Sequence, residues 1–181
     1  MKQRAGMWCS PLVLFLFIIP QCRAATLQYQ IEAAFLFNFT QFVDWPATAF
    51  DSNNSPLVIG VLGEDPFGSD LDDIVRGEVV NGHPLAVERY RSVQEIHRCH
   101  VLFIADSENA AFRSTLLALK HRNVLTVSNL DGFAKAGGVV RFRIADNKLR
   151  FRINVNAAHE AQLVISSKLL RQAELVGSTE D

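Results

Sequence analysis

Three groups of residues in this chain carry side chains able to do chemistry, and the first is a histidine pair around a cysteine. His97, Cys99 and His100 lie close together in the sequence, and imidazole and thiolate are the ligands that zinc prefers. Further ligands are missing from the neighbourhood. His100 begins an apolar run and His97 ends an expected helix, so their side chains need not converge. We therefore expect surface and capping histidines, and no metal site.

The second group consists of two acids and a lysine that follow apolar runs. Asp65, Asp106 and Lys135 have the residue types of a phosphoacceptor site at the carboxyl ends of parallel strands. The leader described below exports the chain to a compartment without a ready phosphodonor, so we interpret the acids as helix caps. The sequence has neither a Gly-x-Ser-x-Gly elbow nor a phosphate-binding glycine loop. No catalytic residue and no cofactor are predicted, and an unrecognised hydrolase stays open as a third functional alternative.

The third group depends on a β-hairpin near the C-terminus. Apolar and polar residues alternate strictly from Val139 to Val155, and Asp146-Asn147 interrupts the pattern with two residues that tolerate left-handed backbone angles. A two-residue turn there pairs Phe142 with Phe151, and every other apolar residue also faces an apolar one. Slipping the register by one residue would expose the whole apolar face. The pattern thus predicts both the hairpin and its register.

The same register creates an arginine ladder on the outer face of the hairpin. Arg143 is expected opposite Arg150, and Arg141 opposite Arg152. Like charges in directly opposite positions destabilise a sheet by a few tenths to ~1 kcal/mol. The ladder is either a solvated surface or a docking face for an acidic partner or an anionic ligand, which would relieve the repulsion.

An aromatic helix is expected from Leu27 to Trp45, because this stretch has neither proline nor glycine and Pro46 follows it. Helical spacing gathers aromatic side chains on one broad stripe. The interpretation favoured here is core packing. The alternative is a hydrophobic surface for a partner or ligand, formed by Phe35, Phe39, Phe42 and Trp45.

The N-terminus has the pattern of a cleaved signal peptide. Lys2 and Arg4 precede the apolar run Pro11 to Ile19, and small residues follow at positions 24 and 25. Removal of residues 1–24 leaves 15 basic and 19 acidic residues, a net charge of −4, and leaves Cys99 as a lone, buried and inert thiol. An uncleaved membrane anchor and a lipid anchor on Cys22 are the alternatives. We expect an exported protein.

The elements between these features indicate the fold. Continuous apolar runs are typical of strands covered on both faces of a parallel sheet, and here they are Leu57 to Leu62, Val101 to Ala105 and Val124 to Val127. Helices are expected at Asp70 to Arg76, Val93 to His97 and Glu108 to His121, and a further strand at Leu85 to Tyr90. From Asn154 to Leu175 we expect helix, broken near Leu163 to Ile165, with Ser166 capping a second piece.

These elements predict an α/β fold: one Rossmann-like layered sandwich with a mostly parallel sheet, one antiparallel hairpin (139–154) and flanking helices. With 181 residues and 49% apolar content, one domain over residues 26–176 and a disordered tail over 177–181 are expected. Charge is locally separated, because acids cluster over residues 64–73 and arginines in the hairpin. A nucleic-acid binder would be basic throughout, so nucleic-acid binding is not expected.

The chain resembles the YfiR family of periplasmic proteins from about Ile31 to Leu175. The resemblance rests on segments in a fixed order: EAAFLFNFTQFVDWP, LVIGVLGEDPFG, VNGHPLAVERY followed by CHVLFIADSE, NVLTVSNLDGFAKAGGVVRF, and RFRINVNAAHEAQLVISSKLL. Each segment alone is weak, but their order and spacing are specific.

The resemblance implies a binding protein rather than an enzyme, located in the periplasm. It implies a repressor that binds the periplasmic part of an inner-membrane diguanylate cyclase (a GGDEF protein), lowers cyclic-di-GMP and biofilm formation, and is relieved by an OmpA-like outer-membrane lipoprotein. Disulfides occur in the family, whereas Cys99 alone remains here, which puts redox control in doubt. A sensor kinase is an alternative partner, a small-ligand sensor is the alternative function, and a homodimer stays open.

Overall fold

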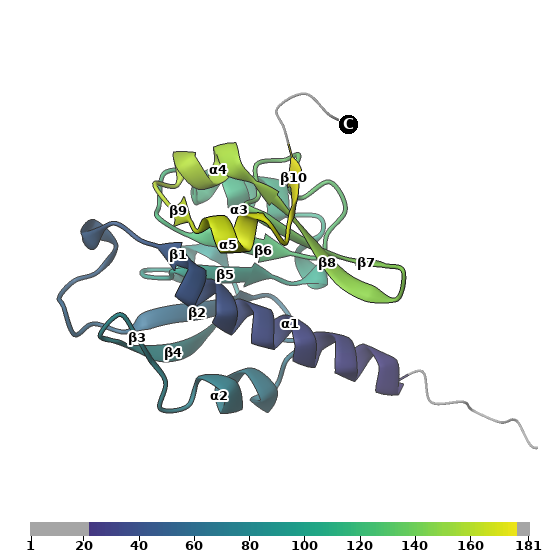
Figure 1. Ribbon diagram of the computed structural model, residues 1–181, viewed down its shortest axis with the longest axis horizontal. Coiled ribbons are helices and arrows are strands. Elements are labelled where there is room, and N and C mark those ends of the chain that lie inside the picture. The colour runs from purple at the N-terminus through teal and green to yellow at the C-terminus, as the bar shows by residue number, and fades with distance from the viewer. Residues whose placement is uncertain (1–21, 177–181) are drawn as a thin grey trace, which may run out of the picture.

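The continuous apolar runs of the sequence form the centre of an eight-stranded sheet in the computed structural model, which describes residues 22–176 (Figure 1). Every residue is buried in the three central strands β2 (Leu57–Leu62), β5 (Val101–Ile104) and β6 (Leu125–Ser128). The strand order is β10-β8-β7-β6-β5-β2-β4-β3. All pairs are parallel except β7–β8 and β3–β4. The predicted mostly parallel α/β sandwich is confirmed.

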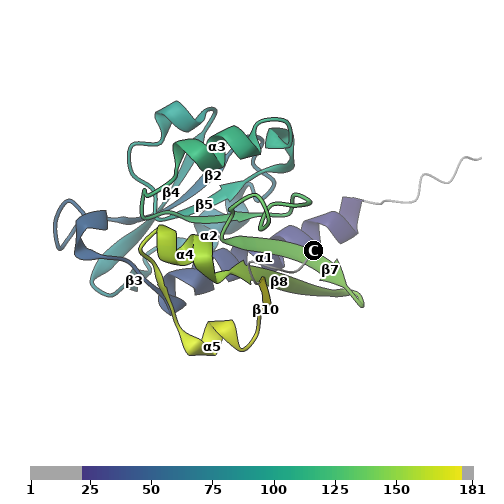
Figure 2. The same cartoon turned by 90° about the horizontal axis from the view of Figure 1, so that it is seen from above.

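Helices cover both faces of this sheet, as Figure 2 shows from above. α1 (Cys22–Phe42) and α2 (Ser69–Val75) pack with the side chains of one face, where Phe39 contacts Phe142 and Phe67 contacts Phe103. α3 (Phe112–Ala118) packs on the other face through Phe112 and Leu116. Two apolar layers therefore sandwich the sheet. No helix among residues 22–176 is long and apolar enough to cross a membrane.

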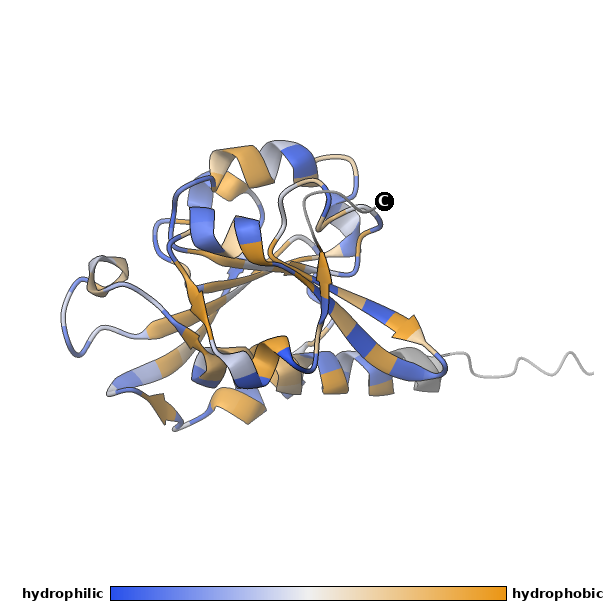
Figure 3. Ribbon diagram, turned by 45° about the horizontal axis from the view of Figure 1, so that its top comes forward, coloured by the Kyte–Doolittle hydropathy of each residue, from blue (hydrophilic) through white to orange (hydrophobic). Residues whose placement is uncertain are grey.

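The hairpin has the predicted register. β7 (Val140–Ala145) and β8 (Lys148–Asn154) are antiparallel, with Phe142 opposite Phe151. Asp146 and Asn147 take positive φ angles of 51° and 56° at the turn. Figure 3 shows hydrophobic and hydrophilic residues alternating along both strands. Alternation was sufficient here because only one register buries the apolar set.

The end of the aromatic helix was predicted wrongly. α1 stops at Phe42, and Val43–Asp44 forms β1, which pairs antiparallel with β9 (Val164–Ile165). The backbone N–H of Ser166 also donates to the carbonyl of Phe42 at 2.9 Å. Pairing with a distant segment satisfies the backbone here and ends the helix before Pro46.

The C-terminal segment was predicted as two helical pieces and is only partly so. α4 (Val155–Glu160) and α5 (Ser167–Leu170) are short, and the predicted break falls at β9. Ser166 caps α5, as predicted, by accepting a hydrogen bond from the Leu169 N–H. However, Glu174–Val176 is the strand β10, parallel to β8, and not helix.

The remaining elements differ from prediction mainly in their bounds. The helix expected at Asp70 to Arg76 is α2, which begins and ends one residue earlier. A 3-10 turn at Val93–Glu95 replaces the helix expected at Val93 to His97. The helix expected at Glu108 to His121 is the shorter α3, preceded by a 3-10 turn at Asp106–Glu108. β4 (His83–Tyr90) starts two residues early because it pairs with β3 (Val79–Val80), and Ala47–Ala49 is a 3-10 turn. The predicted leader lies outside the described residues except positions 22–24, and the predicted tail lies wholly outside them.

Candidate functional site

The four arginines of the ladder lie together on the face of the β7–β8 hairpin turned away from α1. Arg141 is opposite Arg152, and Arg143 is opposite Arg150, as predicted. The other face of the hairpin is apolar, because Phe142 and Phe151 pack against Phe35 of α1 at ring-centroid distances of 6.1 and 5.4 Å. The aromatic contacts with α1 thus hold the arginines in place.

Acidic residues of the same chain neutralise part of the ladder, which the sequence did not reveal. Glu174 of β10 accepts from the Arg152 Nε at 2.9 Å and pairs with the Arg143 Nη2 at 3.3 Å. The Arg152 hydrogen bond and the neighbouring guanidinium charges lower the pKa of the Glu174 carboxyl. Asp131 pairs with Arg141. These ion pairs within the chain relieve part of the like-charge repulsion in the ladder.

The neutralisation is incomplete. Within residues 22–176, Arg150 has no ion pair, and the Nε atoms of Arg141 and Arg143 are buried without a hydrogen-bond partner. The Arg141 and Arg143 side chains are only 19% and 31% exposed, so the ladder is not a fully solvated surface. A buried N–H donor without an acceptor is costly to a fold. These donors fit a carboxylate or another anion.

The four aromatic residues of the predicted hydrophobic surface do not lie on one open face. Phe39 is fully buried and stacks on Phe142 at 5.8 Å, and Phe35 packs beside it. Phe42 is partly buried against the same core. Trp45 lies past the helix end, near the amino ends of the strands, with its ring 6.0 Å from that of His100.

Trp45 lines a pocket of about 460 Å³ at this amino-terminal edge of the sheet. Its Nε1 is buried without a hydrogen-bond partner. Phe50, another lining residue, stacks on His83 at 3.8 Å and on His100 at 4.5 Å. Asp44 and Asp51 add carboxylates to the lining. The pocket combines an aromatic wall with polar groups, which is the usual make-up of a small-molecule site.

His100 and Cys99 are both buried, so the expectation of a surface or capping histidine is wrong for His100. The Nδ1 of His100 accepts from the Val58 N–H at 3.0 Å, its Nε2 lies 3.2 Å from the Ala49 carbonyl, and burial lowers its pKa to about 4. Cys99 is free and buried, with Sγ 3.1 Å from the Val101 carbonyl, and burial raises its pKa to about 12. The predicted burial of Cys99 is confirmed, and its low reactivity stays a prediction. No group of three His, Cys, Asp or Glu residues in the described part of the chain could hold a metal ion.

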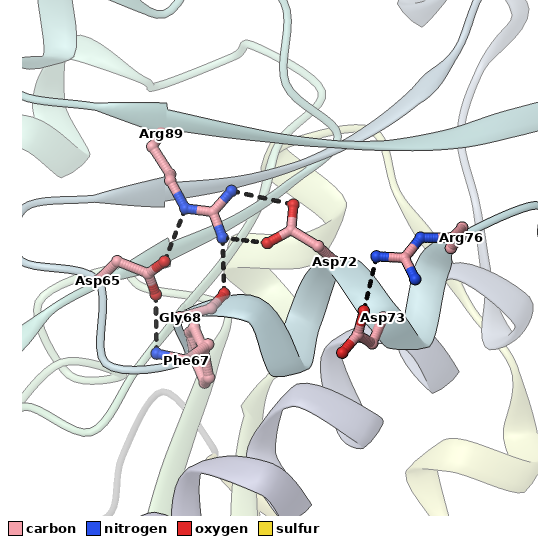
Figure 4. A network of polar contacts seen from close by, with 7 residues as sticks. All are labelled: Asp65, Phe67, Gly68, Asp72, Asp73, Arg76 and Arg89. Atoms are coloured by element: carbon pink, nitrogen blue, oxygen red, sulfur yellow. Dashed lines mark hydrogen bonds and ion pairs between the residues drawn. The ribbon is translucent and has the colours of Figure 1, made fainter.

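An arginine of β4 forms ion pairs and hydrogen bonds with the acidic segment after β2 (Figure 4). Arg89 donates to Asp65 at 2.7 Å, to both carboxylate oxygens of Asp72 at 3.1 and 2.5 Å, and to the Gly68 carbonyl at 2.8 Å. Asp65 also accepts from the Phe67 N–H at 2.8 Å. Asp65 thus fixes the turn before α2 and does not cap the helix, whose N-cap residue Gly68 makes no side-chain cap bond. Asp106 likewise lies inside a 3-10 turn that has no side-chain cap. The expectation that these acids are helix caps is wrong.

A buried carboxyl group on α1 was not predicted from the sequence. Glu32 is fully buried, accepts hydrogen bonds from Gln28 and Asn129 at 2.8 and 3.2 Å, and has its pKa raised by burial to about 7. The charge of Asp106 makes a smaller contribution to this rise. Its place beside Ala33, Leu36 and Phe39 on the inward stripe of α1 was the available signal.

A Rossmann-like α/β sandwich with a basic hairpin face is the class of protein that this fold and site define. The family model described as YfiR/HmsC-like matches residues 29–174, so the chain belongs to that family, and the predicted resemblance is confirmed. At the level of the family, this makes it a periplasmic regulator of cyclic-di-GMP signalling, of a kind that interacts with periplasmic parts of membrane signalling proteins.

No curated protein sequence matches the chain. A similar solved structure is the ABC domain in complex with L-Trp from Streptococcus pneumonia, with 11% identity and a TM-score of 0.48. The match covers 66% of this chain and 55% of that one, so this chain spans about half of its length. At this identity and score, the likeness says nothing about ligand or activity.

Proposed function

We propose that this protein is a periplasmic repressor that binds the periplasmic region of an inner-membrane diguanylate cyclase, and so lowers cyclic-di-GMP and biofilm formation. The observation that carries the proposal is the family match over residues 29–174, which spans nearly the whole described fold. In this proposal the protein acts by binding and not by catalysis. An OmpA-like outer-membrane lipoprotein would relieve repression by competing for it, and a sensor kinase is the alternative partner.

The state of Cys99 supports control by binding. Its thiol is free, buried and held in the protonated form by burial, which raises the pKa to about 12. Thiol oxidation needs an accessible thiolate. Release of repression by a competing protein requires no such group.

Deletion of the coding sequence in the native host tests the proposal. Cyclic-di-GMP and surface attachment should rise in the deletion strain, and expression of the wild-type chain from a plasmid should restore both. Deletion of the partner cyclase as well should abolish the rise, which separates repression of that enzyme from a general effect on growth. An unchanged nucleotide level in planktonic and surface-grown cells contradicts the repressor function.

The pocket around Trp45 favours a second function, that of a periplasmic small-ligand sensor. Its volume of about 460 Å³ and the unpartnered Trp45 Nε1 provide space and a hydrogen-bond donor for a small molecule. Native mass spectrometry of protein purified from the periplasm should then show an added small mass. That mass should be absent from a Trp45→Phe variant, which keeps an aromatic ring and removes the N–H group.

A further inference from the structure

The distal half of the β7–β8 hairpin extends past the strands that flank it. β6 pairs with β7 only at Val140 and Arg141, and β10 pairs with β8 only from Arg152 onward. Within residues 22–176, no strand pairs with residues 142–145 on the side away from β8. Figure 1 shows this part of the hairpin projecting from the sheet. An unpaired edge presents backbone N–H and C=O groups to a further strand.

The hydrogen-bond pattern identifies which residues present those groups. The Asn154 N–H donates to the Val139 carbonyl at 2.8 Å. In an antiparallel pair, successive residues alternate between pointing their backbone groups at the partner strand and away from it. Arg141 and Arg143 therefore point theirs at β8, and Phe142 and Ile144 point theirs at the free edge. A strand laid along this edge would bond to Phe142 and Ile144.

One face of this edge strand attracts anions. Arg141 and Arg143 project from it with buried Nε–H groups that lack an acceptor. Three of the four guanidinium groups pair with two carboxylates, those of Asp131 and Glu174, and the Asp131 side chain is 97% exposed. The Glu174 carboxylate between Arg143 and Arg152 shows the chemistry that this face binds. A second carboxylate nearer Arg150 would meet a charge that is not paired within the described residues.

The opposite face of the same edge is apolar and incompletely covered. Ile144 is 53% exposed and lies opposite Leu149. The helix beneath the hairpin, α1, also leaves Leu27 and Ile31 exposed, by 59% and 42%. Ile31 is one turn before Phe35, which packs against the hairpin. Apolar side chains arriving along the edge would find apolar surface here.

We propose that residues 142–145 of β7 dock an extended segment of a protein partner in which acidic and apolar residues alternate. Side chains of a strand point alternately to opposite faces, so the acids would lie on the arginine ladder and the apolar residues beside Ile144. Backbone bonds to Phe142 and Ile144 would extend the sheet by one strand. Only the identity of the partner, the periplasmic region of the membrane protein, rests on the proposed function.

A peptide titration tests the surface without knowledge of the partner. The probe is acetyl-(Glu-Val)3-amide, added to ¹⁵N-labelled protein and followed by NMR. The backbone amides of Phe142 and Ile144 and the Nε–H of Arg143 should shift together. Acetyl-(Lys-Val)3-amide and a peptide of three glutamates followed by three valines should bind at least tenfold more weakly. N-methylation of alternate peptide bonds of the probe should abolish the shifts, because it removes the strand hydrogen bonds.

Two double variants locate the binding. Arg143→Gln/Arg150→Gln should lower the affinity for the (Glu-Val)3 probe at least tenfold, since it removes two charge-assisted contacts. Arg76→Gln/Arg91→Gln removes the same charge far from the hairpin and should leave the affinity within twofold. Shifts spread evenly over the surface, equal binding of the block peptide, or equal loss in both double variants would overturn the inference.

The cell assay separates this inference from the proposed function. Deletion of the whole protein and the Arg143→Gln/Arg150→Gln variant, present at wild-type abundance, are compared. If they raise cyclic-di-GMP to the same level, the repressor function and the docking surface are both supported. If deletion raises it and the double variant represses like the wild type, the docking surface is overturned and the repressor function stands. If deletion has no effect, the repressor function fails, and the peptide titration alone decides the docking surface.

Discussion

Arg152 and Glu174 form a 2.9 Å hydrogen-bonded ion pair that joins the hairpin to the last described strand, β10. The two residues are register partners in the parallel pair β8–β10. The same carboxylate reaches Arg143 on the next strand, so one acid serves two rungs of the arginine ladder. A C-terminal strand is thus part of the electrostatics of the candidate site.

Replacement of this acid should destabilise the fold. Glu174→Gln removes the charge between Arg143 and Arg152 and leaves their repulsion unopposed. Because the carboxylate is 45% exposed and therefore screened, we expect a loss of about 0.3–1 kcal/mol in the free energy of unfolding. Urea unfolding at pH 7 measures it, and the loss should shrink in 1 M NaCl. Glu160→Gln, at the looser 3.6 Å pair with Lys120, is the control and should have less effect.

Single replacements within the ladder should have opposite signs. Arg150→Gln removes a charge without an ion pair in the described chain and should raise the free energy of unfolding by a few tenths of a kcal/mol. Arg152→Gln breaks the bond to Glu174 and should lower it by a similar amount. Both variants have the same net charge, so a difference in their thermal midpoints reports position. Equal shifts in the same direction would contradict the pairing.

The sequence contains enough information for the hairpin and for the central strands. Only one register of the hairpin buries Phe142, Phe151 and their neighbours, so local alternation determined a contact pattern that the structure reproduces. The unbroken apolar runs likewise identified β2, β5 and β6. The arginine ladder followed as a consequence of the hairpin register.

The pairing of strands that are far apart in the chain could not be predicted from the sequence. β1 and β9 are two residues each and are separated by more than a hundred positions. The predicted break near Leu163 to Ile165 marked β9, but nothing local identified β1 as its partner. β10 lies in a segment whose composition favours helix, and pairing with the edge of β8 overrides that preference. For the same reason the sequence did not show Glu174 as the acid that meets the ladder.

The buried thiol gives a simple test of the local packing. In a Cys9→Ser/Cys22→Ser background, Cys99 should react with a thiol-specific reagent at pH 8 at least a hundredfold more slowly when folded than in denaturant, because burial raises its pKa to about 12. Absorbance of the released chromophore measures the rate. Fast labelling of the folded protein would show that the β2–β5 region opens readily.

A single glycine next to a phenylalanine ring should tolerate no side chain. A Cβ at Gly138 would lie 2.2 Å from the ring of Phe133, which is fully buried. Gly138→Ala should lower the free energy of unfolding by about 1–3 kcal/mol through overpacking. Phe133→Leu added to it should recover part of the loss, whereas Phe133→Leu alone should destabilise. Urea unfolding of the three variants tests whether the two positions are coupled.

Glu32 and His100 should oppose each other in the pH dependence of stability. Burial raises the pKa of Glu32 from 4.5 to about 7, so between these values the folded chain keeps a proton that the unfolded chain has lost, and stability falls as pH rises. Burial lowers the pKa of His100 from 6.5 to about 4, so the unfolded chain binds the extra proton there, and stability rises with pH. From pH 4.5 to 6.5 the two contributions nearly cancel.

Variants at the two positions should uncover the separate slopes. In Glu32→Gln the free energy of unfolding should rise between pH 5 and 6.5 by about 1 kcal/mol per pH unit, and in His100→Gln it should fall by a similar amount. The wild type and a Glu32→Gln/His100→Gln double variant should both be nearly flat over this range. Urea midpoints at half-unit pH intervals measure the slopes, which are independent of any constant loss from altered packing. A flat profile for either single variant contradicts the assignment of that buried group.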